Sequence, residues 1–209
     1  MTLTLGKSRI EALSDGIFAI AMTLLVLKLE VPEVMHQSSN EDMLRKLLAM
    51  TPAFLTYVVT FLIAGGFWFL HHLTFHFIRQ VDGTLVWVNL FFLMLVSLLP
   101  FSAGLMTHLL VHPASQLFYY GNQLAIAIAL NIHWQYAKRK RLLGQCDAAE
   151  LFLLNLRTAE TTTMFAACLA AAFFVPAYSW TPLPVILFGG FVVEQAKKRS
   201  GRVRAAAWK

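Results

Sequence analysis

Residues 9–29 read RIEALSDGIFAIAMTLLVLKL, and this stretch determines the class of the protein. Four polar residues crowd its first turns: Arg9, Glu11, Ser14 and Asp15. From residue 16 to residue 27 the only polar side chain is Thr23. An aspartate so close to lipid is costly and therefore indicates a specific role. A polar anchor followed by an apolar run predicts a transmembrane helix that faces protein or a pore, rather than lipid alone.

The composition extends this interpretation to the whole chain. Of the 209 residues, 58% are hydrophobic and only 13% are charged, whereas soluble domains carry about a quarter charged residues. The net charge of +6 could indicate nucleic-acid binding. The basic residues cluster beside apolar segments instead, so we expect a membrane protein and no nucleic-acid partner. Two cysteines without metal-type spacing predict neither a disulfide framework nor a metal centre.

Six apolar segments are long enough to cross a bilayer, which requires about 20 helical residues. They are expected at about 10–29, 51–78, 85–106, 116–137, 157–175 and 182–196. The second opens with Thr51 and Pro52, a cap residue followed by a first-turn proline. The third contains Pro100. We therefore predict an all-α integral membrane protein in which residues 1–209 form a single six-helix transmembrane domain.

The basic residues predict the orientation of these spans. With six crossings, most lysines and arginines fall on one side: Lys7, Arg9, Arg79, Lys138, Arg139, Lys140, Arg141, Arg157 and six more after residue 196. The other side keeps only Lys28, Arg45 and Lys46 among several acidic residues. The positive-inside rule then places both termini of a multi-pass membrane protein in the cytoplasm.

Successive residues of an α-helix are about 100° apart around its axis, so the residues that share one face of the first helix can be identified. Ile20, Thr23, Leu24 and Leu27 share a stripe, and Ser14 and Asp15 point away from it. The stripe is compatible with ordinary helix packing or with a pore lining. Ser14 and Asp15 are compatible with a helix-start cap favoured by the helix dipole, or with a buried polar network.

Histidines gather on the second predicted helix. Trp68, His72 and His76 follow i, i+4, i+8 spacing, and His71 lies beside them. A metal site would use this face, but no HExxH motif is present. Hydrogen-bonded packing histidines are the other interpretation, with Asp15 as an expected partner. Asn89 on the third helix is another polar group that needs a partner if buried. No catalytic motif is found, so we do not expect an enzyme.

The pattern Arg9-x-x-x-Leu13-Ser14-Asp15 resembles the R-x-x-x-F-S-D signature of the bacterial transmembrane protein 175 family of potassium channels. Further matches occur along helices 1 to 3: Phe67-Trp68, His71-His72, Asp82, Trp87-x-Asn89-Leu90 and Leu99-Pro100-Phe101. The chain departs from the signature at Leu13, where the family has phenylalanine.

This resemblance implies a homotetramer whose central pore is lined by the first helix of each subunit, without a re-entrant selectivity-filter loop. Ile20, Leu24 and Leu27 would form apolar constrictions, and Thr23 a ring of hydroxyls. The network holding the first helix would comprise Arg9, Ser14, Asp15, Trp68, His71, His72 and Asn89. Glu30 would attract cations to the outer mouth. Potassium is then the only metal expected, as permeant ion, and no cofactor is expected.

Two other function classes remain open at this point. A proton-coupled secondary transporter would use Asp15 and the histidines of the second helix as a proton relay. A membrane-embedded metalloenzyme would use His71, His72 and His76. Coupling of transport to a pH gradient distinguishes the first, and metal content of the purified protein distinguishes the second.

Overall fold

The computed structural model describes residues 6–32, 39–108 and 112–174. Within them every regular element is helical, apart from one isolated antiparallel bridge between Ile78 and Leu143. The elements are α1 (Lys7–Leu24), the 3₁₀ turn η1 (Val26–Lys28), α2 (Asn40–Ala49), α3 (Thr51–Phe77), α4 (Gly83–Ser97), α5 (Leu99–His108), α6 (Pro113–Arg139) and α7 (Ala148–Phe174). The all-α prediction is confirmed for this part of the chain, and the predicted span at 182–196 lies outside it.

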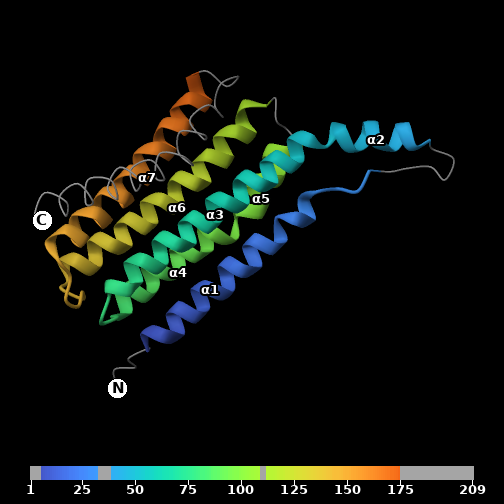
Figure 1. Ribbon diagram of the computed structural model, residues 1–209. Helices are drawn as coiled ribbons and strands as arrows, with labels where there is room; N and C mark the ends of the chain where they lie inside the picture. Colours follow the sequence, from blue (N-terminus) through green and yellow to red (C-terminus); the bar gives the residue numbers. More distant parts are fainter. Residues whose placement is uncertain (1–5, 33–38, 109–111, 175–209) are drawn as a thin grey trace, which may run out of the picture.

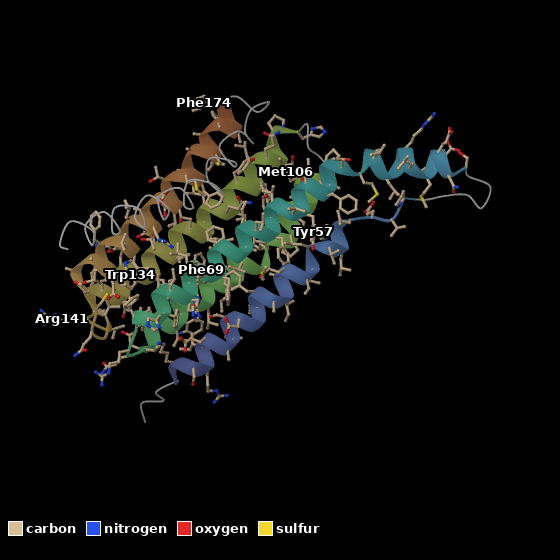
Figure 2. The ribbon with its side chains drawn as sticks, viewed as in Figure 1. Tyr57, Phe69, Met106, Trp134, Arg141 and Phe174 are labelled. Atoms are coloured by element: carbon tan, nitrogen blue, oxygen red, sulfur yellow. The ribbon has the colours of Figure 1, made fainter. Side chains whose placement is uncertain are left out.

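The long helices run side by side in one bundle (Figure 1), with α1 along one flank and α7 along the other. Helix α6 packs against α4, α5 and α7, and α1 packs against α3, α4 and α5. The largest fully buried side chains include Trp134, Tyr119 and Tyr120, all from α6. Figure 2 shows Trp134 and Arg141 near the end of the bundle that carries the N-terminus, and Met106 towards the opposite end. Helix α2 leaves the bundle beyond that opposite end.

Three segments of the described chain are long and apolar enough to cross a membrane: Lys7–Lys28, Thr51–Phe77 and Gly83–Thr107. They coincide with the first three predicted spans. Helices α6 and α7 have 27 residues each, but they carry more polar side chains. Many of those on α6 are buried, among them Asn122, Gln123 and His133, so they do not face lipid.

The first helix ends earlier than predicted. It stops at Leu24, and η1 tightens the chain over Val26–Lys28 before Leu29 adopts an extended conformation. Pro32 follows shortly after, and a proline disfavours helical backbone in the residue before it. Leu27 therefore lies in the 3₁₀ turn rather than on the α-helical stripe.

The third predicted span is two helices. Because Pro100 has no N–H, the carbonyl of Val96 cannot receive the usual bond from it. That carbonyl accepts a bond from the backbone N–H of Leu98 instead, where α4 is capped. Pro100 then occupies the first turn of α5, which is a position that tolerates proline.

Helix α3 begins at Thr51, as predicted, but its cap differs from the prediction. Met50 is the cap residue and provides no side-chain bond. The hydroxyl of Thr51 instead donates to the carbonyl of Leu48 at 2.6 Å.

Two helix starts were not predicted. Helix α2 opens with a capping box, in which the Ser39 side chain accepts from the Asp42 N–H and Asp42 accepts from the Ser39 N–H. Helix α7 begins at Ala148, well before residue 157, and the Glu150 carboxylate accepts from the Asp147 N–H at 2.9 Å. Arg157 therefore lies inside α7 and not in the preceding loop.

Candidate functional site

The predicted stripe of α1 lies on the outer surface of the described subunit. Ile20 is 57% exposed, Leu24 41% and Leu27 70%, although each is a large apolar side chain. Thr23 is also exposed between them. The opposite face of α1 is buried in the bundle through Ile10, Ser14, Phe18, Ala21 and Leu25. This exposed face is free to contact lipid, a second subunit or an aqueous pathway.

The hydroxyl of Thr23 is the polar feature of that face. Its Oγ1 donates a hydrogen bond to the carbonyl of Ile20 at 2.9 Å. Because the hydroxyl proton is used inside the helix, only the oxygen lone pairs remain for a ligand outside it. An oxygen in this state can accept a hydrogen bond or coordinate a cation.

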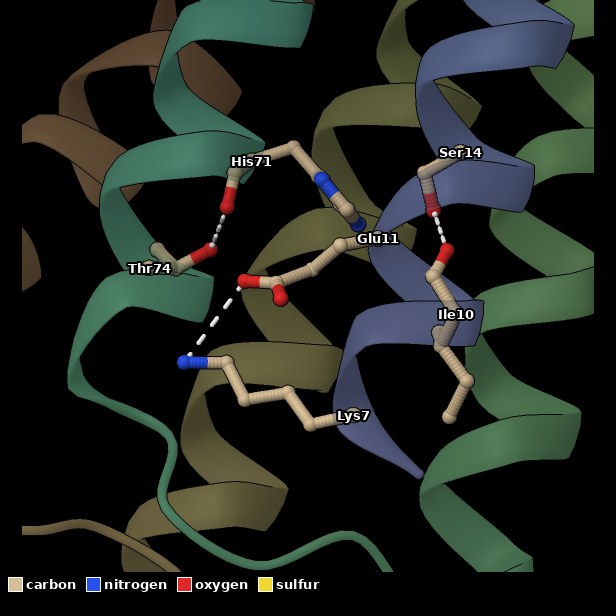
Figure 3. Close-up of polar contacts among 6 residues, drawn as sticks. All are labelled: Lys7, Ile10, Glu11, Ser14, His71 and Thr74. Carbon is tan, nitrogen blue, oxygen red and sulfur yellow. Dashed lines mark hydrogen bonds and ion pairs between the residues drawn. The ribbon is translucent and has the colours of Figure 1, made fainter. Parts of the chain in front are cut away.

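Behind the stripe, a buried chain of hydrogen bonds joins three helices. Asn89 of α4 donates from Nδ2 to Ser14 Oγ of α1 at 3.2 Å, and its Oδ1 lies 2.9 Å from His71 Nε2 of α3. Ser14 in turn donates to the Ile10 carbonyl at 2.9 Å (Figure 3). Since the amide oxygen can only accept, His71 carries its proton on Nε2. All these side chains are almost fully buried, so the chain fixes α1 against α3 and α4.

Aromatic rings enclose the imidazole of His71. It stacks on Phe92 at 5.2 Å between ring centroids with an interplanar angle of 3°, and lies 4.5 Å from Phe75. Its backbone carbonyl accepts from the Thr74 hydroxyl at 2.8 Å (Figure 3). The ring thus has one hydrogen-bond partner, and its other neighbours are rings, including the imidazole of His133 at 5.9 Å between centroids. This setting suits a fixed structural histidine.

Asp15 makes a separate contact between α1 and α3. Its Oδ1 accepts from the indole Nε1 of Trp68 at 2.8 Å. The expectation that Asp15 would pair with a histidine is wrong, because His71 turns to Asn89. His72 stacks on Trp68 at 5.8 Å and is exposed.

Two residues predicted for the network stay outside its hydrogen bonds. The side chain of Arg9 is exposed and makes no hydrogen bond or ion pair with the described residues. His72 contributes only its stacking contact. Among the residues that the structure describes, no group of three His, Cys, Asp or Glu side chains is placed to hold a metal ion.

The far end of α1 leads to the predicted outer mouth. Glu30 is exposed there, directly after η1. The stem of Lys28 lies against Gly104 of α5, where an added Cβ would come within 3.2 Å of Lys28 Cδ. The missing side chain at Gly104 therefore makes room for the lysine stem.

Sequence analysis missed two further polar contacts that join helices of the bundle. Asp82 caps α4 by accepting from the Leu85 N–H at 2.8 Å, and it also accepts from the Tyr136 hydroxyl at 2.7 Å. The Asp82-Gly83 pair before an apolar helix is a recognisable cap signal. The Thr60 hydroxyl lies 2.8 Å from the Tyr119 hydroxyl, linking α3 to α6, and no local pattern predicts that pairing.

Comparison with known proteins identifies the family. The family model described as the endosomal/lysosomal potassium channel TMEM175 matches residues 9–100, from α1 to the start of α5. A potassium channel of Chamaesiphon minutus is 38% identical over 142 residues, covering 66% of this chain and 69% of that protein. The chain belongs to the TMEM175 family. The predicted resemblance is thereby confirmed, and the membrane-spanning class with it.

The likeness extends to a solved TMEM175 structure. The crystal structure of a lysosomal potassium-selective TMEM175 homologue from Chamaesiphon minutus superposes with a TM-score of 0.76 at 30% identity, covering 87% of this chain and 94% of that one. The rat endosomal/lysosomal proton channel TMEM175 is 36% identical over 101 residues, which is 46% of this chain but only 20% of that protein. Both the stripe and the polar network fall within the part matched by the TMEM175 model.

Proposed function

We propose that this protein is a potassium channel in which four copies of α1 line a central pore. Its TMEM175 membership and the names of its bacterial relatives support potassium as the ion. A single exposed stripe cannot enclose a pathway, whereas four copies around an axis can. We further propose that residues 1–209 form one six-helix domain in the bacterial plasma membrane with both termini in the cytoplasm.

The observation that carries this proposal is the contrast between the two faces of α1. A lipid-facing helix could carry the same exposed isoleucine and leucines. It would have no need of a buried Ser14–Asn89–His71 chain that fixes its rotation. Fixing the rotation of a helix matters when one of its faces must point at an axis.

In the proposed pore, Ile20, Leu24 and Leu27 form apolar rings. A cation that crosses them must shed part of its hydration shell, so the rings restrict passage by size and by exclusion of water. Leu27 lies beyond the α-helix in η1. Its ring is therefore set by the 3₁₀ turn and not by the helical repeat of α1.

The Thr23 ring would replace some of the lost water. Its hydroxyl donates to the Ile20 carbonyl, so the oxygen lone pairs can turn to the ion. This arrangement favours the more easily dehydrated potassium over sodium. Glu30 at the outer mouth would raise the local cation concentration.

Ion flux into liposomes that contain the purified protein tests the proposal. We expect potassium flux above sodium flux without a proton gradient.

Ile20→Ala should raise flux and lower the selectivity, because it widens an apolar ring. Thr23→Ala should lower the potassium preference, and Thr23→Ser should retain it. Leu156→Ala is the matched control, since Leu156 is an exposed apolar residue of α7. Unchanged flux and selectivity in Ile20→Ala would refute the pore assignment.

Proton transport is the second candidate, because the rat relative is named a proton channel. The same liposomes distinguish it. Flux that appears only with a pH gradient, and that is lost in Asp15→Asn and His71→Gln, would replace the potassium proposal with proton-coupled transport. The engagement of Asp15 by Trp68 and of His71 by Asn89 favours structural roles for both.

A further inference from the structure

A cavity of about 340 Å³ opens at the end of the bundle where α1 begins and α3 ends. Three of the residues that line it have basic or potentially basic side chains: Lys7 from α1, and His76 and Arg79 from the end of α3 and the turn after it. Gly144 and Gln145 from the loop between α6 and α7 complete it. The cavity therefore gathers side chains from three separate parts of the sequence.

The charge of this cavity is positive. Arg79 is exposed and makes no ion pair with any carboxylate of the described residues. Lys7 lies 3.5 Å from Glu11, one turn along α1 (Figure 3). Glu11 offsets part of the charge of Lys7, but it does not line the cavity. The positive charge of the Arg79 guanidinium therefore remains uncompensated there.

The backbone beneath these side chains is held in place. The Arg79 N–H donates to the Leu142 carbonyl at 2.9 Å, and the Gly144 N–H donates to the Phe77 carbonyl at 2.9 Å. These bonds flank the antiparallel bridge between Ile78 and Leu143. They join the α3–α4 corner to the α6–α7 corner, so the backbone carrying Arg79 is fixed before any ligand arrives.

An apolar track leads away from the cavity along α3. Leu55, Leu62 and Phe69 precede His76 at intervals of seven residues. Each interval rotates the position around the helix by only about 20°, so these residues lie on one face. All three are exposed, and Figure 2 marks Phe69 on this helix. A headgroup in the cavity would have its acyl chains beside this track.

We propose that the cavity binds the phosphate group of an anionic phospholipid from the leaflet at this end of the bundle. A guanidinium can bind phosphate oxygens in pairs, and an ammonium adds a point charge. A soluble phosphate would need only the basic walls, whereas the track along α3 indicates a ligand with acyl chains. The inference requires a membrane-embedded bundle and does not depend on the pore assignment.

Native mass spectrometry of the full chain tests this site, with phosphatidylglycerol and phosphatidylcholine as probes. We expect selective retention of phosphatidylglycerol, reduced about fivefold in Arg79→Gln. Gln145→Glu should reduce it similarly, because it adds a carboxylate while keeping both cations. Glu11→Gln should increase it, because Lys7 loses its competing partner. Arg139→Gln is the control, an exposed basic residue at the same end of the bundle but outside the cavity.

Three results would overturn the proposal. Equal losses in Arg79→Gln and Arg139→Gln would indicate attraction by general surface charge. Equal retention of both lipids would exclude a site for anionic headgroups. Displacement of phosphatidylglycerol by millimolar inorganic phosphate would assign the cavity to a soluble anion. All the substituted side chains are on the surface, so an unchanged elution profile on size-exclusion chromatography verifies folding.

Discussion

Asp15 has one hydrogen bond to the rest of the described protein, from the indole of Trp68 at 2.8 Å. A bond from an N–H to a carboxylate is charge-assisted and stronger than a neutral one. Both side chains reach the surface, where water offers competing bonds. The contact therefore stabilises the α1–α3 pair by a modest amount.

Two substitutions at Asp15 distinguish the effect of losing the hydrogen-bond acceptor from the effect of losing the charge. Asp15→Ala removes the acceptor and should lower the free energy of unfolding by about 1 to 2 kcal/mol. Asp15→Asn keeps an acceptor oxygen and should lower it by less. Thermal melting of the purified protein, together with the fraction of cross-linked oligomer, measures both effects.

Trp68→Phe is the matched partner variant for this prediction. Trp68→Phe should lower the free energy of unfolding by about as much as Asp15→Ala. The two decreases should not add in the double variant, because both substitutions remove the same hydrogen bond. A change of potassium selectivity in Asp15→Asn with unchanged melting would instead place Asp15 in the ion pathway.

At the scale of the elements, capping residues set helix starts that hydrophobicity does not reveal. Ser39-x-x-Asp42 and Asp147-x-x-Glu150 both begin helices, and both match the spacing of a capping box. A search for apolar spans overlooks α2 because its first turn is polar, and it starts α7 too late because Glu150, Asn155 and Arg157 interrupt the apolar run there. Helix α7 consequently extends two turns beyond the expected membrane segment.

Removing one of these caps should loosen the helix end only locally. Asp147→Ala removes the carboxylate whose Oδ1 accepts from the Ala149 N–H at 3.5 Å. It should cost about 1 kcal/mol and speed amide hydrogen exchange in the first turn of α7. Thr161→Ala is the control, because the exposed Thr161 hydroxyl merely donates back to the Arg157 carbonyl. Equal exchange in Asp147→Ala and the unmodified protein would mean that packing alone holds this helix start.

The helices could be predicted from the sequence where one physical rule governs them. Apolar length predicted α1 and α3, and the stripe at Ile20 and Leu24 followed from helical periodicity. The end of α4 at Ser97 could be predicted only by giving Pro100 more weight than the continuous apolar run around it. Periodicity could not pair Asp15 with Trp68 or Asn89 with His71, because it carries no information about which neighbour a helix faces. Only the family resemblance grouped these residues.

For the whole molecule, orientation in the membrane remains a prediction from charge, and Cys146 offers a test. This half-buried residue lies in the loop between α6 and α7. Burial, and then the nearby Glu150 carboxylate, raise the pKa of its thiol. A raised pKa lowers the thiolate fraction at neutral pH, so alkylation should be slow near pH 7 and faster towards pH 9.

A membrane-impermeant maleimide should label Cys146 in inside-out vesicles and not in right-side-out vesicles. Cys168 is buried and should stay unlabelled in the folded protein, so Cys146→Ser should abolish the signal. Labelling in right-side-out vesicles alone would reverse the proposed orientation of both termini.

The hydrogen bonds that hold α1 differ in kind from those that hold its neighbours. Within the described residues, the backbone of α1 bonds only locally, whereas backbone bonds join the corners at Arg79 and Gly144. Side-chain hydrogen bonds attach α1 at two points, Ser14 and Asp15. Rotating α1 about its axis would thus cost about 1 to 3 kcal/mol in hydrogen bonds, and it would also withdraw Phe18 and Leu25 from the core. A variant that loses the side chain of Ser14 or Asp15 therefore removes one of the two polar attachments of α1, whereas no side-chain substitution removes the backbone bonds that join the two corners.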